Sequence, residues 1–245
     1  MNGPGQFPPT RWTMVEAIRH ESEEKRREAL DFLAQNYWKP VYYYLLRAGR
    51  TPHDAEDLTQ GFFEFAIQRN TFAKAERERG HFRTFLLRAL QNFQISEFRK
   101  QQAAMRRPDG GFVSIHELVK TDAYPIELKH NETPEAVFTR AWFQGLLLRV
   151  LKILRANLRE SGMAAHYEIL NQFDIQPWLD GVERPAQAEL AIRMGLTAKE
   201  VSRRLGVARQ ALEQLLRKEI ECYASSPSEI ASEWNDFRRS LGANT

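Results

Sequence analysis

The sequence predicts an all-α protein made of two helical domains joined by a linker. Apolar residues recur at helical spacing along almost all of the 245 residues, and no run shows the period-two alternation expected of a strand. The periodicity breaks near the middle of the chain, where two glycines and Pro125 fall among scattered charges. We therefore expect domains at 10–107 and 133–245 and a linker at 108–132.

The first domain is expected to contain four helices, at about 12–20, 25–48, 51–69 and 81–106. The second helix ends at Gly49, because glycine readily adopts the left-handed conformation found just after a helix. The third helix starts at Thr51 and Pro52, since threonine can cap a helix and proline fits its first turn. A charged connector at 70–80 precedes the fourth helix.

The second domain is expected to begin with a long helix from about 133 to 160, since Thr133 and Pro134 form a helix start. Shorter helices are expected at about 164–173, 185–194 and 197–223. Ser226 and Glu229 have the spacing of a capping box, which predicts a tail helix from about 227 to 241. The sequence assigns no role to this tail helix.

Composition narrows the class of protein. The 35 Lys and Arg residues nearly balance the 32 Asp and Glu residues, so the positions of the charges matter more than the net charge of +3. The single cysteine, Cys222, cannot form an internal disulfide, which favours a reducing compartment. The most apolar stretch, 141–154, is interrupted by charges and is too short to span a bilayer. We expect a cytoplasmic protein without a membrane span.

The sequence contains no pattern that predicts catalysis. Its six histidines are scattered, with no HExxH pair, and it has no glycine-rich phosphate loop and no nucleophile elbow. We therefore expect no enzymatic activity, no metal site and no cofactor.

The third and fourth predicted helices carry opposite charges. Asp54, Asp57 and further polar residues share the side of the third helix opposite its apolar stripe. The stretch 83–107, which is most of the fourth helix and the residue after it, has six basic residues and a single acid. Such a helix can place cations on phosphates, and Phe93 and Phe98 can stack on unpaired bases where they are exposed. The alternative is a solvated helix whose aromatic residues belong to the core.

A helix-turn-helix pattern lies in the second domain. It requires a small residue, a glycine four positions later and an aliphatic residue six positions after the glycine, because the helices touch at the first position and the chain turns at the second. Two overlapping registers satisfy this spacing: Ala191, Gly195 and Val201, or Ser202, Gly206 and Leu212. The alternative interpretation is an ordinary packed helical hairpin.

Three segments occur in an order that is typical of one family. Residues 54–63 read DAEDLTQGFF, residues 80–90 read GHFRTFLLRAL, and residues 133–142 read TPEAVFTRAW. In this order they resemble the extracytoplasmic-function (ECF) sigma factors of bacteria, and the resemblance covers most of 12–241. It implies a sigma domain 2-like four-helix bundle, a linker and a sigma domain 4-like helix-turn-helix domain.

The resemblance implies a factor that binds core RNA polymerase, recognises promoter DNA and stabilises strand separation without catalysis of its own. It implies contacts between the clamp helices of the polymerase beta-prime subunit and Asp54, Asp57, Gln60 and Glu64. The connector at 70–80 corresponds to the family's loop that captures a flipped base. An anti-sigma factor is a further partner by family analogy only.

The expected DNA contacts fall on two elements. On the fourth helix they are Arg83, Arg88, Asn92, Arg99, Lys100 and Arg106. On the helix-turn-helix they are Thr197, Lys199, Arg203 and Arg204 for the first register, and Arg209 and Gln210 for the second. The spacing of the family segments slightly favours the first register and does not exclude the second.

Two other functions fit parts of the sequence. A helix-turn-helix regulator would bind duplex DNA without polymerase, but it leaves the acidic side of the third helix unexplained. An all-helical scaffold for protein interactions would use its charges only for solvation. Binding to core polymerase distinguishes the sigma factor from the regulator, and salt-dependent DNA binding distinguishes it from the scaffold. The sequence indicates neither the promoter nor the activating signal.

Overall fold

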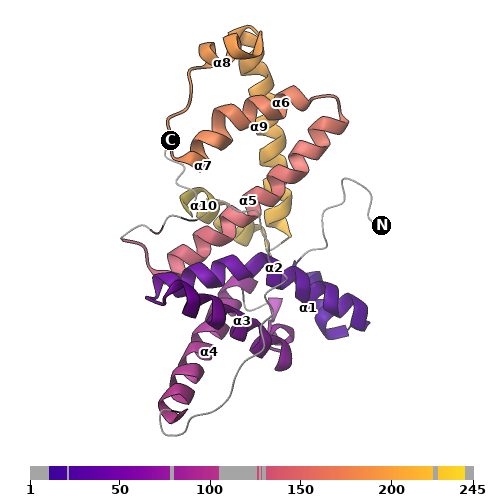
Figure 1. Cartoon of the computed structure of the whole chain (residues 1–245). Coiled ribbons are helices and arrows are strands. Elements are labelled where there is room, and N and C mark those ends of the chain that lie inside the picture. The colour runs from indigo at the N-terminus through magenta and orange to yellow at the C-terminus, as the bar shows by residue number, and fades with distance from the viewer. Residues whose placement is uncertain are drawn as a thin grey trace. The chain divides into compact units, whose positions relative to one another are not determined.

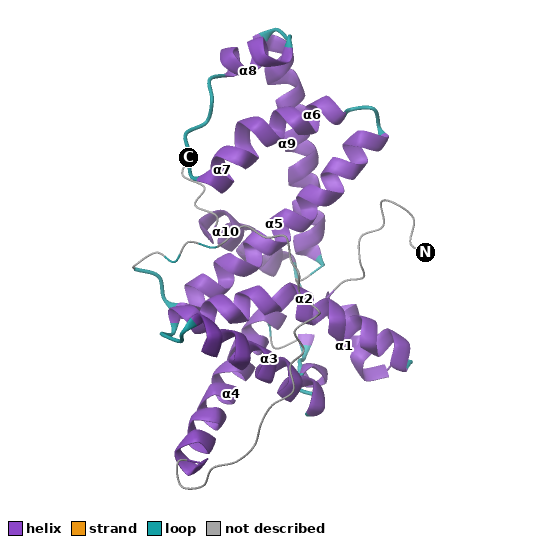
Figure 2. Ribbon diagram, in the orientation of Figure 1, coloured by secondary structure: helices purple, strands orange, loops and turns teal. Residues whose placement is uncertain are grey.

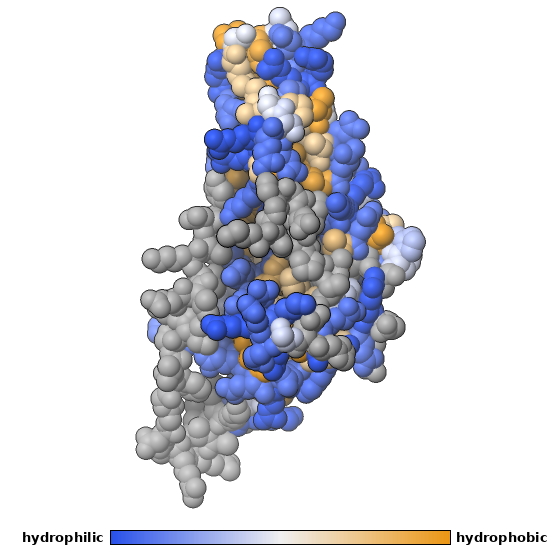
Figure 3. Space-filling view, turned by 90° about the vertical axis from the view of Figure 1, so that its right-hand side faces the viewer, coloured by the Kyte–Doolittle hydropathy of each residue, from blue (hydrophilic) through white to orange (hydrophobic). Residues whose placement is uncertain are grey.

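The computed structural model describes residues 11–20, 22–77, 80–104, 126, 128, 131–222 and 226–240, and its regular elements are all helices (Figures 1 and 2). The predicted all-α class is therefore confirmed for this part of the chain. Within the same residues, none of the helices combines the length and the apolar character that crossing a bilayer requires. On the face drawn in Figure 3, most described side chains are hydrophilic, with smaller apolar areas between them.

The chain folds as two compact units, which we describe separately. The N-terminal unit comprises Pro9–Gly145 and Glu221–Thr245. The described residues of the other unit, which we call the hairpin unit, are Leu146–Ile220. The N-terminal unit contains α1 (Arg11–His20), α2 (Glu23–Arg47), α3 (Pro52–Gln68), the short 3-10 segment η1 (Phe72–Lys74), α4 (Phe82–Ala104), the first turns of α5 (Pro134–Glu160), and α10 (Pro227–Ser240).

The helices α1 to α4 lie close to their expected bounds. Helix α3 starts as its sequence predicts, because Thr51 Oγ1 accepts a hydrogen bond from the Asp54 backbone N–H at 3.2 Å and Pro52 occupies the first turn. The chain leaves α2 through Gly49, whose φ of 87° lies in the left-handed region that glycine adopts without strain.

An aromatic cluster forms the core of the N-terminal unit. The ring of Tyr37 on α2 lies 5.5 Å from that of Phe82 on α4 and 6.4 Å from that of Phe138 on α5. Trp12 on α1 also packs against Phe82, at 6.2 Å. Because burying a Phe side chain stabilises a fold by about 1.5–3 kcal/mol, this cluster holds four helices of the unit together.

The hairpin unit contains the rest of α5, then α6 (Ala164–Leu170), a π-helical segment η3 (Asn171–Ile175), α7 (Gln176–Asp180), α8 (Gln187–Met194) and α9 (Ala198–Glu221). Its apolar core includes Leu154, Ile169, Leu190, Val201 and Leu205. The sequence did not predict η3 and α7. Pro177 normally ends a helix, but here it lies in the first turn of α7, where its missing N–H costs nothing.

The division of the chain into two compact units differs from the expected domain boundaries. The predicted linker, 108–132, lies outside the described residues except for 126, 128, 131 and 132. The start of α5 belongs to the N-terminal unit because Phe138 is buried against α2, and because the Arg47 Nε–H donates to the Glu132 carbonyl at 2.6 Å. The tail helix α10 also belongs to the N-terminal unit rather than to the helix-turn-helix.

Candidate nucleic-acid interface

The acidic side of α3 lies on the surface of the N-terminal unit. Asp54 and Asp57 are exposed, whereas Gln60 and Glu64 are partly buried and joined by a 3.1 Å hydrogen bond from Gln60 Nε2 to Glu64 Oε1. Asp54 also contributes to the helix start, because its carboxylate accepts a hydrogen bond from the Thr51 hydroxyl at 2.7 Å. All four residues that were expected to contact the polymerase therefore lie on α3. Asp57 is exposed and, unlike Asp54, does not form a hydrogen bond with the N-cap residue Thr51.

Helix α3 packs directly against α4. The ring of Phe93 on α4 lies 5.7 Å from that of Phe62 and 5.4 Å from that of Phe65. A Cβ atom at Gly61 would lie 3.5 Å from Phe93 Cζ, which is an ordinary van der Waals distance, so the two helices are in close contact here. The acidic helix and the basic helix are thus neighbours in space, as the sequence-based hypothesis requires.

The far half of α4 presents both cationic and apolar side chains to solvent. Phe98 is 55% exposed and Ile95 is 51% exposed, and Arg99 beside them is also exposed. They line an open hollow of about 500 Å³, whose full lining is Ala48, Arg50, Gln94, Ile95, Phe98 and Arg99. Exposed apolar side chains that are grouped in this way mark a binding surface more often than isolated ones do.

The expected contacts of α4 differ in accessibility. Arg88, Asn92 and Arg99 are exposed. The side chain of Lys100 and the whole of Arg106 lie outside the described part of the chain. Phe93 is only 4% exposed, so Phe98 is the one of the two candidate stacking residues that a base can reach.

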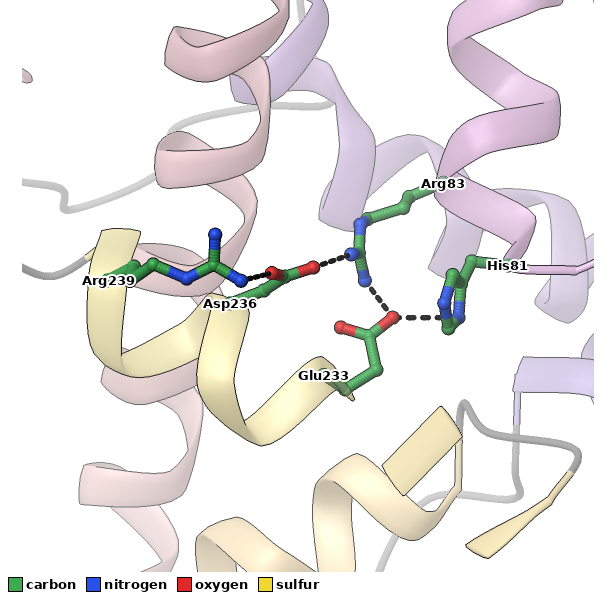
Figure 4. Close-up of polar contacts among 5 residues, drawn as sticks. All are labelled: His81, Arg83, Glu233, Asp236 and Arg239. Atoms are coloured by element: carbon green, nitrogen blue, oxygen red, sulfur yellow. Dashed lines mark hydrogen bonds and ion pairs between the residues drawn. The ribbon is translucent and has the colours of Figure 1, made fainter. Parts of the chain in front are cut away.

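Arg83 differs from the other described contacts expected of α4 because it is buried. Its side chain is only 10% exposed and lies under the tail helix, where it forms ion pairs with Glu233 and Asp236 (Figure 4). The guanidinium also lies over the rings of Trp142 and Phe143, at 5.3 Å from each centroid. Arg83 was expected to contact DNA, but in this arrangement α10 covers it, and no sequence pattern indicated that residues 150 positions apart would meet.

His81 completes this buried cluster. Its Nδ1 lies 2.8 Å from Glu233 Oε1, and the two side chains are 21% and 1% exposed. Burial, followed by the neighbouring Arg83 guanidinium, holds the pKa of His81 below its ordinary value of 6.5, although Glu229 and Asp236 act in the opposite direction. Burial also lowers the pKa of Arg83, and Asp236 opposes that shift.

The position of the turn between α8 and α9 distinguishes the two helix-turn-helix registers. Gly195 has a φ of 63° and ends α8 in the left-handed conformation, while Ala191 and Val201 are buried at the contact between the helices. Thr197 and Glu200 then form a capping box, with Thr197 N donating to Glu200 Oε2 at 2.9 Å and Glu200 N donating to Thr197 Oγ1 at 3.2 Å. The first register is the turn, and the second lies inside the continuous helix α9.

The cations of α9 fall into two groups. Lys199 and Arg203 are exposed in its first turns, and Arg204 is partly buried. Arg209 is instead paired in bidentate fashion with Asp174 of η3, at 2.7 and 2.9 Å, and lies over the Phe173 ring. The hydrogen bonds with Asp174 raise the pKa of Arg209.

The expected contacts of the hairpin have different environments. Arg209 connects α9 to η3 through its ion pair with Asp174, although its side chain is exposed, and Gln210 next to it is also exposed. The hydroxyl of Thr197 is used in the cap of α9. Lys199 and Arg203 at the start of α9 are exposed, so they stay candidate contacts for a phosphate backbone.

Comparison with known proteins provides no relative: the chain matches no family model, no curated protein and no solved structure. Among the described residues, no three His, Cys, Asp or Glu side chains gather closely enough to hold a metal ion. Glu233 and Asp236 of the tail helix are the residues that sequence reasoning missed. Their three-residue spacing on one helical face was the available signal, but it did not reveal their partner.

Proposed function

We propose that this chain is a sigma-type initiation factor, similar to the ECF class, that binds core RNA polymerase and holds separated promoter strands. The observation that carries the proposal is the direct packing of two unlike surfaces in one unit. Helix α3 presents carboxylates, and its neighbour α4 presents guanidinium groups together with exposed apolar side chains. One surface suits a protein partner, and the other suits nucleic acid.

The surface of α4 has the chemistry of a single-strand site. Cations next to aromatic side chains bind unpaired nucleic acid, because the cations neutralise phosphates while a base stacks on the ring. Phe98 lies in the open hollow with Arg50 and Arg99, so a base on its ring would have a cation within reach of its phosphate. Stacking of one base contributes about 1–3 kcal/mol, which offsets part of the cost of unstacking that base from the duplex.

The surface of α3 has the chemistry of a docking face for a basic partner. Exposed carboxylates such as Asp57 attract a positively charged surface and orient it before close contact forms. A protein that only bound DNA would gain nothing from these carboxylates, because phosphates repel them. The acidic side of α3 therefore supports a partner other than DNA.

A second candidate function rests on the hairpin unit alone. The capped turn at Gly195 and the exposed Lys199 and Arg203 suit a helix placed in a major groove. A regulator that binds duplex DNA without polymerase would need only this unit.

Co-elution with purified bacterial core polymerase tests the proposal. The sigma-type function predicts that the chain travels with the core enzyme in size-exclusion chromatography at moderate salt. If the chain binds duplex DNA but elutes separately from the core enzyme, the second function replaces the first.

A further inference from the structure

Helix α10 is held by apolar contacts and by a cluster of charges. Only Glu233 and Phe237 are buried among its fourteen residues. The Phe237 ring packs against Phe143 at 5.6 Å and stacks on Trp234 of its own helix at 5.5 Å. The docking of α10 therefore involves the carboxylate of buried Glu233 as well as these rings.

The carboxylates of α10 form ion pairs with Arg83. Among the described residues, the ion pairs of Arg83 are with Glu233 and Asp236, both from α10 (Figure 4). The other described residues of the unit supply the rings of Trp142 and Phe143 for the face of the guanidinium, but no carboxylate that pairs with it. Without α10, the arginine would be a cation on an aromatic platform with no anion beside it.

A cation in such a position requires an anion. Leaving one partner of a buried ion pair uncompensated is strongly unfavourable. The fork of a guanidinium binds a carboxylate and a phosphate with the same bidentate geometry. The place that α10 fills is thus an anion site, with His81 2.8 Å from the same Glu233 oxygen that Arg83 contacts.

We propose that α10 is a C-terminal latch whose carboxylates occupy a phosphate site formed by Arg83 and His81. A phosphate of a nucleic-acid strand takes this site when α10 leaves. The inference rests on the proposed strand binding by α4, the helix that carries Arg83. In the latched state the chain binds a strand more weakly, because one cation of α4 is withheld and two carboxylates lie beside it.

The test uses two full-length variants that change charge equally. The latch variant is Glu233→Gln with Asp236→Asn. The control is Glu28→Gln with Asp31→Asn, which alters two exposed carboxylates of α2 in the same unit. Amide hydrogen exchange in 227–240 reports the docking of α10, and a labelled oligodeoxythymidylate titrated at several salt concentrations reports the phosphate site.

The latch variant is expected to lose amide protection in α10 and to bind the strand about tenfold more tightly than the wild type. The slope of log K against log salt becomes steeper by about 0.7, the increment for one additional phosphate contact on a single strand. The control keeps α10 protected and leaves the slope unchanged. Adding Arg83→Gln to the latch variant removes the additional slope.

Each other result overturns a distinct claim. Release of α10 with an unchanged slope removes the phosphate site but leaves strand binding by α4 in place. Retained protection of α10 in the latch variant removes the role of the carboxylates. If the wild type and all variants fail to bind the strand, the proposed function fails, and the latch fails with it. If the double variant does not fold, Asp236→Asn alone replaces it, because that side chain is 30% exposed. The single variant is expected to change the protection of α10, the strand affinity and the salt slope in the same directions by smaller amounts.

Discussion

Each end of α4 carries a phenylalanine followed by an arginine, but the two pairs have opposite environments. At its start, Arg83 is buried between two aromatic rings and the carboxylates of α10. Toward its other end, Arg99 and Phe98 are open to solvent beside a hollow. The number of cations along a helix can therefore exceed the number that is accessible to nucleic acid, because a tail helix far away in the sequence can neutralise one of them.

Substitution of two phenylalanines of α4, one buried and one exposed, should show the largest difference between a packing role and a binding role. Phe93→Ala is expected to lower the free energy of unfolding by about 3–5 kcal/mol, because Phe93 fills the contact between α3 and α4. Phe98→Ala is expected to change stability by less than about 0.5 kcal/mol, but to weaken strand binding by about 1–3 kcal/mol. Urea denaturation and oligonucleotide titration of both variants separate the two roles. Equal losses of stability would contradict the assigned positions.

Two arginines of α4 form a second matched pair. Arg83→Met removes the partner of buried Glu233, so we expect the free energy of unfolding of the N-terminal unit to fall by about 3 kcal/mol. Arg88→Met, on the exposed side of the same helix, is expected to change it by less than about 0.5 kcal/mol. Thermal or urea unfolding measures both. A stable Arg83→Met protein in which α10 stays protected would show that the ion pairs do not hold the tail.

The acidic surface of α3 gives the next prediction. Asp57→Arg is expected to weaken binding to core polymerase about tenfold, because it places a cation on a face that attracts a basic partner. Asp31→Arg makes the same charge change at an exposed position of α2 and serves as the control. Fluorescence anisotropy of the labelled chain measures both affinities. Equal affinities would remove α3 from the docking surface.

The pH dependence of stability has the smallest expected effect. The pKa of His81 in the folded chain lies below the ordinary 6.5. As the pH falls through 6.5, the unfolded chain therefore binds more protons than the folded chain does. The free energy of unfolding of the N-terminal unit therefore decreases on acidification through this range, and His81→Gln makes the decrease smaller. Urea denaturation of both proteins at several pH values measures it. A wild type that becomes more stable below pH 6.5 would contradict the sign.

The sequence was informative where the interactions are local. Helix starts at Thr51 and Thr197 follow from capping, which depends on residues three positions apart. The turn at Gly195 could be predicted from spacing, but choosing it over Gly206 required the folded helices, because both positions satisfy the same local rule.

The sequence was uninformative where distant segments meet. Periodicity identified α10 as a helix, but nothing local indicates that Glu233 would reach Arg83 on α4. The same holds for Arg209, which a local pattern assigns to DNA and the fold pairs with Asp174. The burial of Phe93 and the exposure of Phe98 also depend on where α3 packs, which helical periodicity alone does not determine.

Run-off transcription by purified core polymerase tests the central claim most directly, with one template fully duplex and one already open at the promoter. We expect transcripts from the duplex template only when the chain is added. Phe98→Ala should lose most transcripts from the duplex template and retain those from the open one. No transcription with the wild-type chain, or equal losses from both templates, would contradict strand holding by α4.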